Sequence, residues 1–77
     1  MPDTRVRLGP QRRASPASLA TLDAMARLAG QTSSAVHVIV AREPGVVEHA
    51  RAVAHQAGVA ISVDLRAYSV RVRFGGR

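Results

Sequence analysis

The chain has 77 residues, 47% of them hydrophobic, and a formal net charge of +6 at pH 7. This hydrophobic share excludes wholesale disorder, and the length predicts one domain over residues 1–77 with flexible ends at 1–3 and 75–77. The absence of cysteine excludes disulfides, thiolate catalysis and cysteine-ligated zinc. No apolar run is long enough to cross a membrane, and no apolar segment of a secretory signal follows the N-terminal arginines, so we expect a cytoplasmic protein.

The first elements predicted along the chain are a short strand and a helix. Residues 4–8, Thr-Arg-Val-Arg-Leu, alternate polar and apolar side chains, as a strand does. Ser15 and Pro16 mark the start of the helix, because a serine hydroxyl accepts from a free backbone N–H and proline is tolerated at the first helical position. Gly30 is expected to end this helix as a left-handed cap. Its buried face is predicted to hold Leu19, Leu22, Ala26 and Ala29.

The middle of the chain predicts a buried strand followed by a second helix. Residues 35–42 form an almost continuous apolar run, which is typical of a strand that is covered on both faces or central in a sheet. Residues 43–45, Glu-Pro-Gly, end this strand and open the helix, and Gly58 marks the helix end. The helix is expected to bury Val46, Ala50, Val53, Ala54 and Ala57.

Two alternating strands follow, over residues 59–65 and 68–74, joined by a hairpin at Arg66-Ala67. In the second of these strands Arg71 and Arg73 are expected to point outward. The side chains predicted to point inward are Val59, Ile61, Val63, Leu65, Tyr68, Val70, Val72 and Phe74.

The element order is strand–helix–strand–helix–strand–strand. This order predicts an α+β two-layer sandwich in which two helices pack on one face of a mixed four-stranded sheet, with right-handed crossovers. A core of this size leaves only about 3–5 kcal/mol of net stability, so homodimerisation would not be surprising.

Nothing in the sequence predicts catalysis, and we expect a protein that is not an enzyme. His49 and His55 are six positions apart on the second helix and point away from each other, and His37 lies on a strand. We therefore expect surface or packing histidines, with no metal site. No nucleophile elbow, no pair of carboxylates on one element and no glycine-rich phosphate loop is present, so we predict no catalytic residue and no cofactor.

The charge pattern favours binding to a polyanion. All eleven basic residues are arginine, and a strongly basic chain attracts nucleic acid, either RNA or DNA, or an acidic protein surface. Because no aromatic side chain is expected to point outward, binding would depend on phosphates and would be sensitive to salt. A scattered set of solvated charges is the alternative. The candidate nucleic-acid-binding residues are Arg5, Arg7, Arg12, Arg13, Arg71 and Arg73.

Residues 35–74 resemble the sulfur-carrier family typified by TusA and SirA in the spacing of "VHVIVAREPGVVEHARAVAHQAGVAISV" and "YSVRVRF". That family has Cys-Pro at the start of its first helix, where this chain has Ser15-Pro16, and a second proline where this chain has Ser18. A serine hydroxyl cannot carry a persulfide, so the resemblance implies a member of the fold without sulfur transfer that docks on a protein partner.

The same element order is similar to that of the C-terminal domain of translation initiation factor 3 and of the Alba chromatin proteins, which bind RNA or DNA. This likeness is one of topology, and a fold does not determine a function. Our leading hypothesis is a small non-enzymatic, basic, nucleic-acid-binding module. The alternatives are a cysteine-free TusA-like docking or regulatory module, and a phage or plasmid accessory protein that acts on a host protein.

Overall fold

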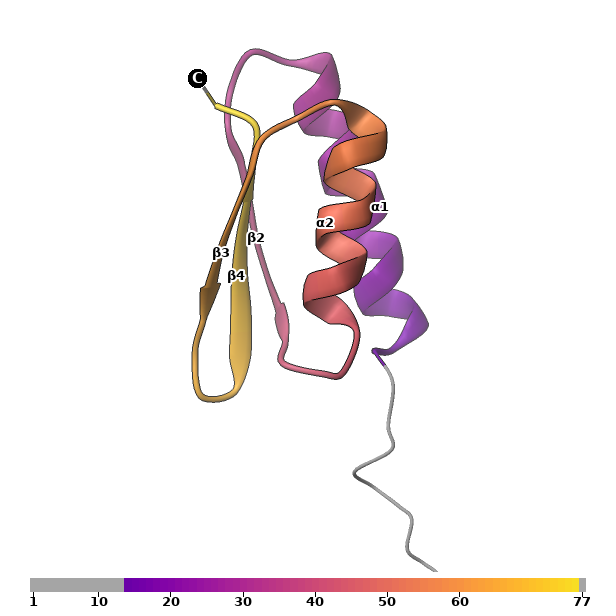
Figure 1. The fold of residues 1–77 in the computed structure, drawn as a ribbon, viewed down its shortest axis with the longest axis vertical. Coiled ribbons are helices and arrows are strands. Elements are labelled where there is room, and N and C mark those ends of the chain that lie inside the picture. The colour runs from indigo at the N-terminus through magenta and orange to yellow at the C-terminus, as the bar shows by residue number, and fades with distance from the viewer. Residues whose placement is uncertain (1–13, 77) are drawn as a thin grey trace, which may run out of the picture.

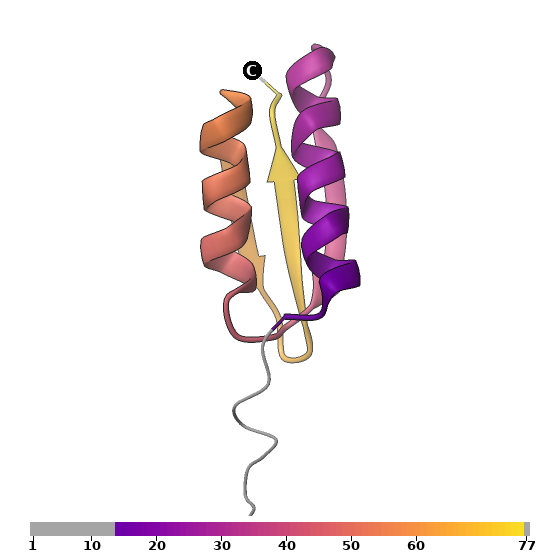
Figure 2. The ribbon, with the colours of Figure 1, turned by 90° about the vertical axis from the view of Figure 1, so that its right-hand side faces the viewer.

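A computed structural model describes residues 14–76, in which two helices cover one face of a three-stranded sheet (Figures 1 and 2). This part of the chain is α+β, as predicted. The elements in chain order are α1 (Pro16–Gln31), β2 (Val36–Ala41), α2 (Val46–Ala57), β3 (Ile61–Leu65) and β4 (Ser69–Phe74).

The sheet has the strand order β2-β4-β3, and β4 runs antiparallel to both neighbours. The predicted mixed four-stranded sheet is therefore not seen among the described residues, whose three strands are paired antiparallel. The strands β2 and β3 do run parallel to each other, but β4 lies between them, so each adjacent pair is antiparallel. The strand predicted at residues 4–8 lies outside the described residues.

The core lies between the helices and β4. The β4 residues Val70, Val72 and Phe74 are at most 2% exposed, because the central strand is covered by both helices. On the two outer strands, β2 and β3, Val40 is buried. The other side chains of these strands that face the helices are partly buried against the same core, namely Val36, Val38, Ile61 and Val63. From the helices the core receives Leu22, Ala26, Ala29, Val46, Ala50, Val53 and Ala54.

Two residues predicted to point inward are exposed. Tyr68 is 90% exposed and Leu65 is 52% exposed. Both lie at the β3–β4 hairpin, which reaches past the ends of the helices at one end of the sheet (Figure 1). Strand alternation therefore does not predict burial there, since no helix covers this part of the sheet.

The prediction that residues 35–42 form a strand that is covered on both faces or central in the sheet is also wrong, since β2 lies at an edge of the described sheet and one of its faces is exposed. On β2, His37 is exposed and Ile39 is 63% exposed, because the helices cover only the opposite face of the sheet. Gly30 is not a cap but lies inside α1, where a Cβ atom would come within 3.2 Å of the Ala57 carbonyl oxygen. The predicted cap at Gly58 is confirmed, with a φ of 69°.

The two aromatic residues provide a matched test of this fold. We expect Phe74→Ala to cost about 3–5 kcal/mol, comparable with the whole stability of so small a domain, because it empties the centre of the core. Tyr68→Ala removes a ring of similar size that contacts little, so its effect should stay within about 0.5 kcal/mol. Urea denaturation followed by circular dichroism measures both. Equal losses for the two variants would contradict the observed placement of the core.

Candidate nucleic-acid interface

The central strand positions two of the predicted site residues. Successive side chains of a strand point to opposite faces, so the burial of one set of β4 residues under the helices places Arg71 and Arg73 on the other face. Both arginines are exposed, as predicted. The two arginines are two positions apart in the sequence, so their Cα atoms lie about 7 Å apart along the strand.

The neighbouring strands complete this surface, which we call the arginine face. In the strand register Arg71 lies between Ile39 and Asp64, and Arg73 lies between His37 and Ser62. Residues directly opposite each other on adjacent strands point to the same face. These six residues line an open groove of about 430 Å³, together with Val38 and Val72. The groove is a surface on which an extended ligand can lie.

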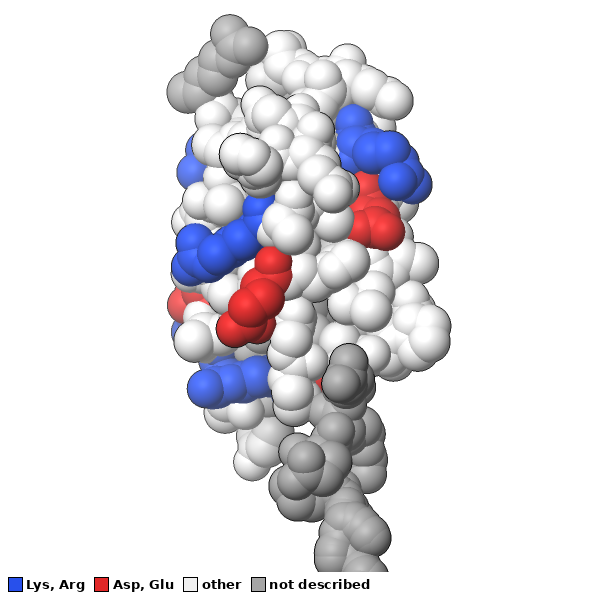
Figure 3. Space-filling view, turned by 45° about the vertical axis from the view of Figure 1, so that its right-hand side comes forward, with Lys and Arg blue, Asp and Glu red and all other residues white. Residues whose placement is uncertain are grey.

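The arginine face has an excess of positive charge. Asp64 is paired with Arg66, whose Nε and Nη2 atoms lie 3.0 and 2.9 Å from Asp64 Oδ2. Within residues 14–76 the only other acid–base pair joins Asp23 to His49, so Arg71 and Arg73 have no acidic partner in this part of the chain. On the outer surface of the domain where the helices lie, basic and acidic side chains lie next to each other (Figure 3).

The other predicted site residues, Arg5, Arg7, Arg12 and Arg13, lie outside the described residues. The prediction that they form one surface with Arg71 and Arg73 therefore stays a prediction. The first described residue, Ala14, donates its backbone N–H to the Pro44 carbonyl oxygen at 3.0 Å. This contact places the attachment point of the N-terminal arginines at the β2–α2 loop, at the same end of the sheet as the β3–β4 hairpin (Figure 1).

That end of the sheet carries three exposed residues that were not among the predicted site residues, Arg42, Arg66 and Tyr68. The Arg42 Nη1 atom donates to the Arg66 carbonyl oxygen at 2.9 Å, and the Arg42 backbone N–H donates to the Tyr68 carbonyl oxygen at 3.2 Å. The Arg66 N–H donates to the Ser69 carbonyl oxygen at 2.9 Å and closes the hairpin. The only sequence signal for this cluster was the closeness of Tyr68 to the predicted turn.

The histidines do not form a reactive cluster. His37 is exposed on the arginine face, and His55 is exposed on α2. His49 joins the two helices, with its Nε2 atom 2.8 Å from Asp23 Oδ1. Among residues 14–76 no group of three His, Cys, Asp or Glu side chains could hold a metal ion.

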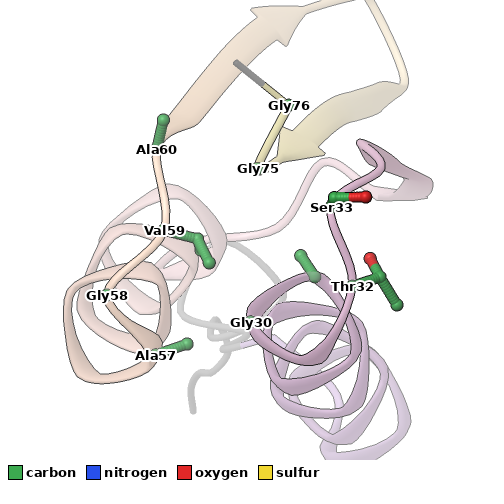
Figure 4. Close-up of a pocket in the computed structure, with 10 residues that line it drawn as sticks. Gly30, Thr32, Ser33, Ala57, Gly58, Val59, Ala60, Gly75 and Gly76 are labelled. Carbon is green, nitrogen blue, oxygen red and sulfur yellow. The ribbon is translucent and has the colours of Figure 1, made fainter.

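A small hollow lies at the opposite end of the domain, where both helices end (Figure 4). Its volume is about 300 Å³, and the residues that line it are glycine, alanine, valine, serine and threonine. The side chains drawn in Figure 4 are short, and none of them is charged. This hollow therefore offers hydroxyl groups and backbone atoms, but no charged side chain and none that could serve as a general acid or base.

Ser15 caps α1, as predicted. Its hydroxyl accepts from the Ser18 N–H at 3.2 Å, and Pro16 is the first helical residue. The Ser15 N–H in turn donates to Glu43 Oε1 at 3.1 Å, which ties the start of α1 to the β2–α2 loop. These hydrogen bonds give Ser15 a structural role at the start of α1.

No family model, curated protein or solved structure matches the chain. The resemblances to the sulfur carriers and to the two nucleic-acid-binding folds therefore stay predictions. Among residues 14–76, neither helix is long and apolar enough to cross a membrane.

The cap gives a test that separates asparagine from aspartate. We expect Ser15→Ala to cost about 1 kcal/mol and Ser15→Asn to cost little, because only the second keeps an oxygen that accepts from the helix N-terminus. Ser15→Asp should be less stable than Ser15→Asn, since the new carboxylate would lie beside that of Glu43. Thermal denaturation at neutral pH measures the series, with the exposed Ser33→Ala as the control. Equal stability of the aspartate and asparagine variants would contradict the observed position of Glu43.

Proposed function

We propose that the protein binds nucleic acid through the arginine face, by contacts between guanidinium groups and backbone phosphates. One observation carries the proposal: the central strand presents Arg71 and Arg73 side by side on an uncovered face, with no acidic partner within residues 14–76. A guanidinium group binds phosphate oxygens through two parallel N–H donors. Two such groups about 7 Å apart on a rigid strand can contact phosphates of one strand without a change in the fold.

The distribution of charge along the chain supports the same partner. Residues 14–76 contain six arginines and four acidic residues, a net charge of +2, and the remaining +4 belongs to residues 1–13 and 77. Arg5, Arg7, Arg12 and Arg13 supply most of that remainder. In this proposal they add phosphate contacts to those of Arg71 and Arg73, and the binding reads the backbone more than the base sequence.

A second candidate function is docking on an acidic protein surface. The observation that favours it is Ile39, an apolar side chain that is 63% exposed between the polar residues of the arginine face. Protein interfaces combine a central apolar contact with a charged rim. The two candidates differ in what Ile39 does, because phosphate contacts do not need it and a protein interface does.

The proposal predicts that charge position matters more than total charge. Changing Arg71 and Arg73 together to Gln should weaken oligonucleotide binding about tenfold or more and flatten the plot of log K against log salt by about 1.4–1.8 units. The matched control changes Arg27 and Arg51 to Gln. These two arginines are exposed on α1 and α2, so this variant loses the same amount of charge from the outer surface of the helices and leaves the arginine face intact. Fluorescence anisotropy of labelled single-stranded and duplex oligonucleotides at several salt concentrations measures both.

Equal losses in the two double variants would show attraction by total charge and no specific surface. An absence of binding at low salt would contradict the proposal. If Ile39→Ala bound an acidic protein more weakly than the wild type but bound the oligonucleotide equally well, docking on an acidic protein surface would be favoured.

A further inference from the structure

The exposed tyrosine at the end of the sheet points to one class of nucleic acid. Resting on the proposed function, we propose that the ligand of the arginine face is single-stranded, and that Tyr68 stacks on one of its unpaired bases. Tyr68 directly precedes β4, so it lies three residues before Arg71 in the chain, or about 10 Å at the rise of a strand. By strand alternation Tyr68 falls on the side of Val70 and not on that of Arg71, but it lies in the hairpin beyond the ends of the helices, so a nucleic-acid strand on the arginine face can reach the ring by passing around this end of the sheet.

The ring of Tyr68 is presented by an ordered turn. The Tyr68 carbonyl oxygen accepts from the Arg42 N–H at 3.2 Å, and the next residue, Ser69, accepts from the Arg66 N–H at 2.9 Å. The backbone on both sides of the ring is thus fixed to the sheet, while 90% of the residue is exposed. A ring held in this way can bind a flat ligand without an additional cost of ordering the loop.

Positive charge lies at the same turn as Tyr68. The Arg42 guanidinium is held at the turn by its 2.9 Å hydrogen bond to the Arg66 carbonyl oxygen, and Arg42 has no acidic partner within residues 14–76. Its remaining N–H donors are free to bind a phosphate next to a base on Tyr68. An exposed aromatic ring flanked by basic groups is the combination by which proteins bind single strands without strong sequence preference.

A duplex would make no use of this arrangement. In a double helix the base faces are stacked on each other, so an aromatic side chain at a protein surface can contact only the backbone and the groove edges. Unpaired bases have free faces, and stacking is tolerant of sequence because each base has one. The phosphate contacts of Arg71 and Arg73 alone would accept either form, and Tyr68 is the feature that selects the single strand.

The sequence provides a clean spectroscopic probe. Tyr68 is the only tyrosine, and the chain has no tryptophan. In Tyr68→Trp the single indole can be excited outside the absorption of nucleic acid, and its emission then reports base stacking at this position alone. The ligands are an oligothymidylate, an abasic strand of the same length, and a duplex with the same number of phosphates per strand.

We expect Tyr68→Ala to weaken binding of the oligothymidylate about fivefold or more while leaving the affinity for the abasic strand unchanged. Tyr68→Trp should bind as well as the wild type, with emission quenched by the oligothymidylate and not by the abasic strand. Thermal denaturation of Tyr68→Ala checks that the fold is intact.

Two outcomes separate the two proposals. If Tyr68→Ala binds the oligothymidylate as the wild type does, while the Arg71 and Arg73 variant binds weakly, the stacking inference is overturned and phosphate binding stands. If the wild type binds none of the three ligands but binds polyglutamate, both proposals fail and the ligand is an acidic polypeptide.

Discussion

The alternation of β4 links the stability of this domain to its candidate function. The strand pairs with both other strands and contributes Val70, Val72 and Phe74 to the core. The same pleat places Arg71 and Arg73 on the opposite face. A shift of one residue in the strand register would bury both arginines and expose the centre of the core, at a cost of several kcal/mol for each buried charge. The arginines are therefore held in place by the packing behind them.

Patterns of neighbouring residues in the sequence predicted the features of the fold that a few neighbouring residues determine, such as the alternation of a strand or the cap of a helix. The alternation of residues 70–74 correctly separated the buried side of β4 from Arg71 and Arg73, and the cap at Ser15 followed from its hydroxyl and the adjacent proline. The place of β2 in the sheet was not predictable in this way. An apolar run such as residues 35–42 has the same pattern whether one or both faces are covered, and only the positions of the helices decide between them.

The candidate site was predicted only in part. Its two described members follow from the period of a strand, whereas Arg42 reaches the hairpin through a contact with Arg66, 24 residues away, that no local pattern contains. Tyr68 was assigned inward because alternation was extended to the edge of a turn, where the chain leaves the strand and the helices no longer cover it. Its exposure changes the chemistry of the surface, since a ring that can stack complements the arginines that bind phosphate.

The central claim is that the uncovered sheet face, and not the helical side, meets the nucleic acid. A titration of the ¹⁵N-labelled protein with an unlabelled oligonucleotide, followed by amide chemical shifts, tests this most directly. We predict that the largest shifts fall on His37, Arg71, Arg73 and the β3–β4 hairpin, with small shifts along the exposed side of α1 and α2. Shifts confined to the helices, with the amides of β4 unchanged, would contradict the account.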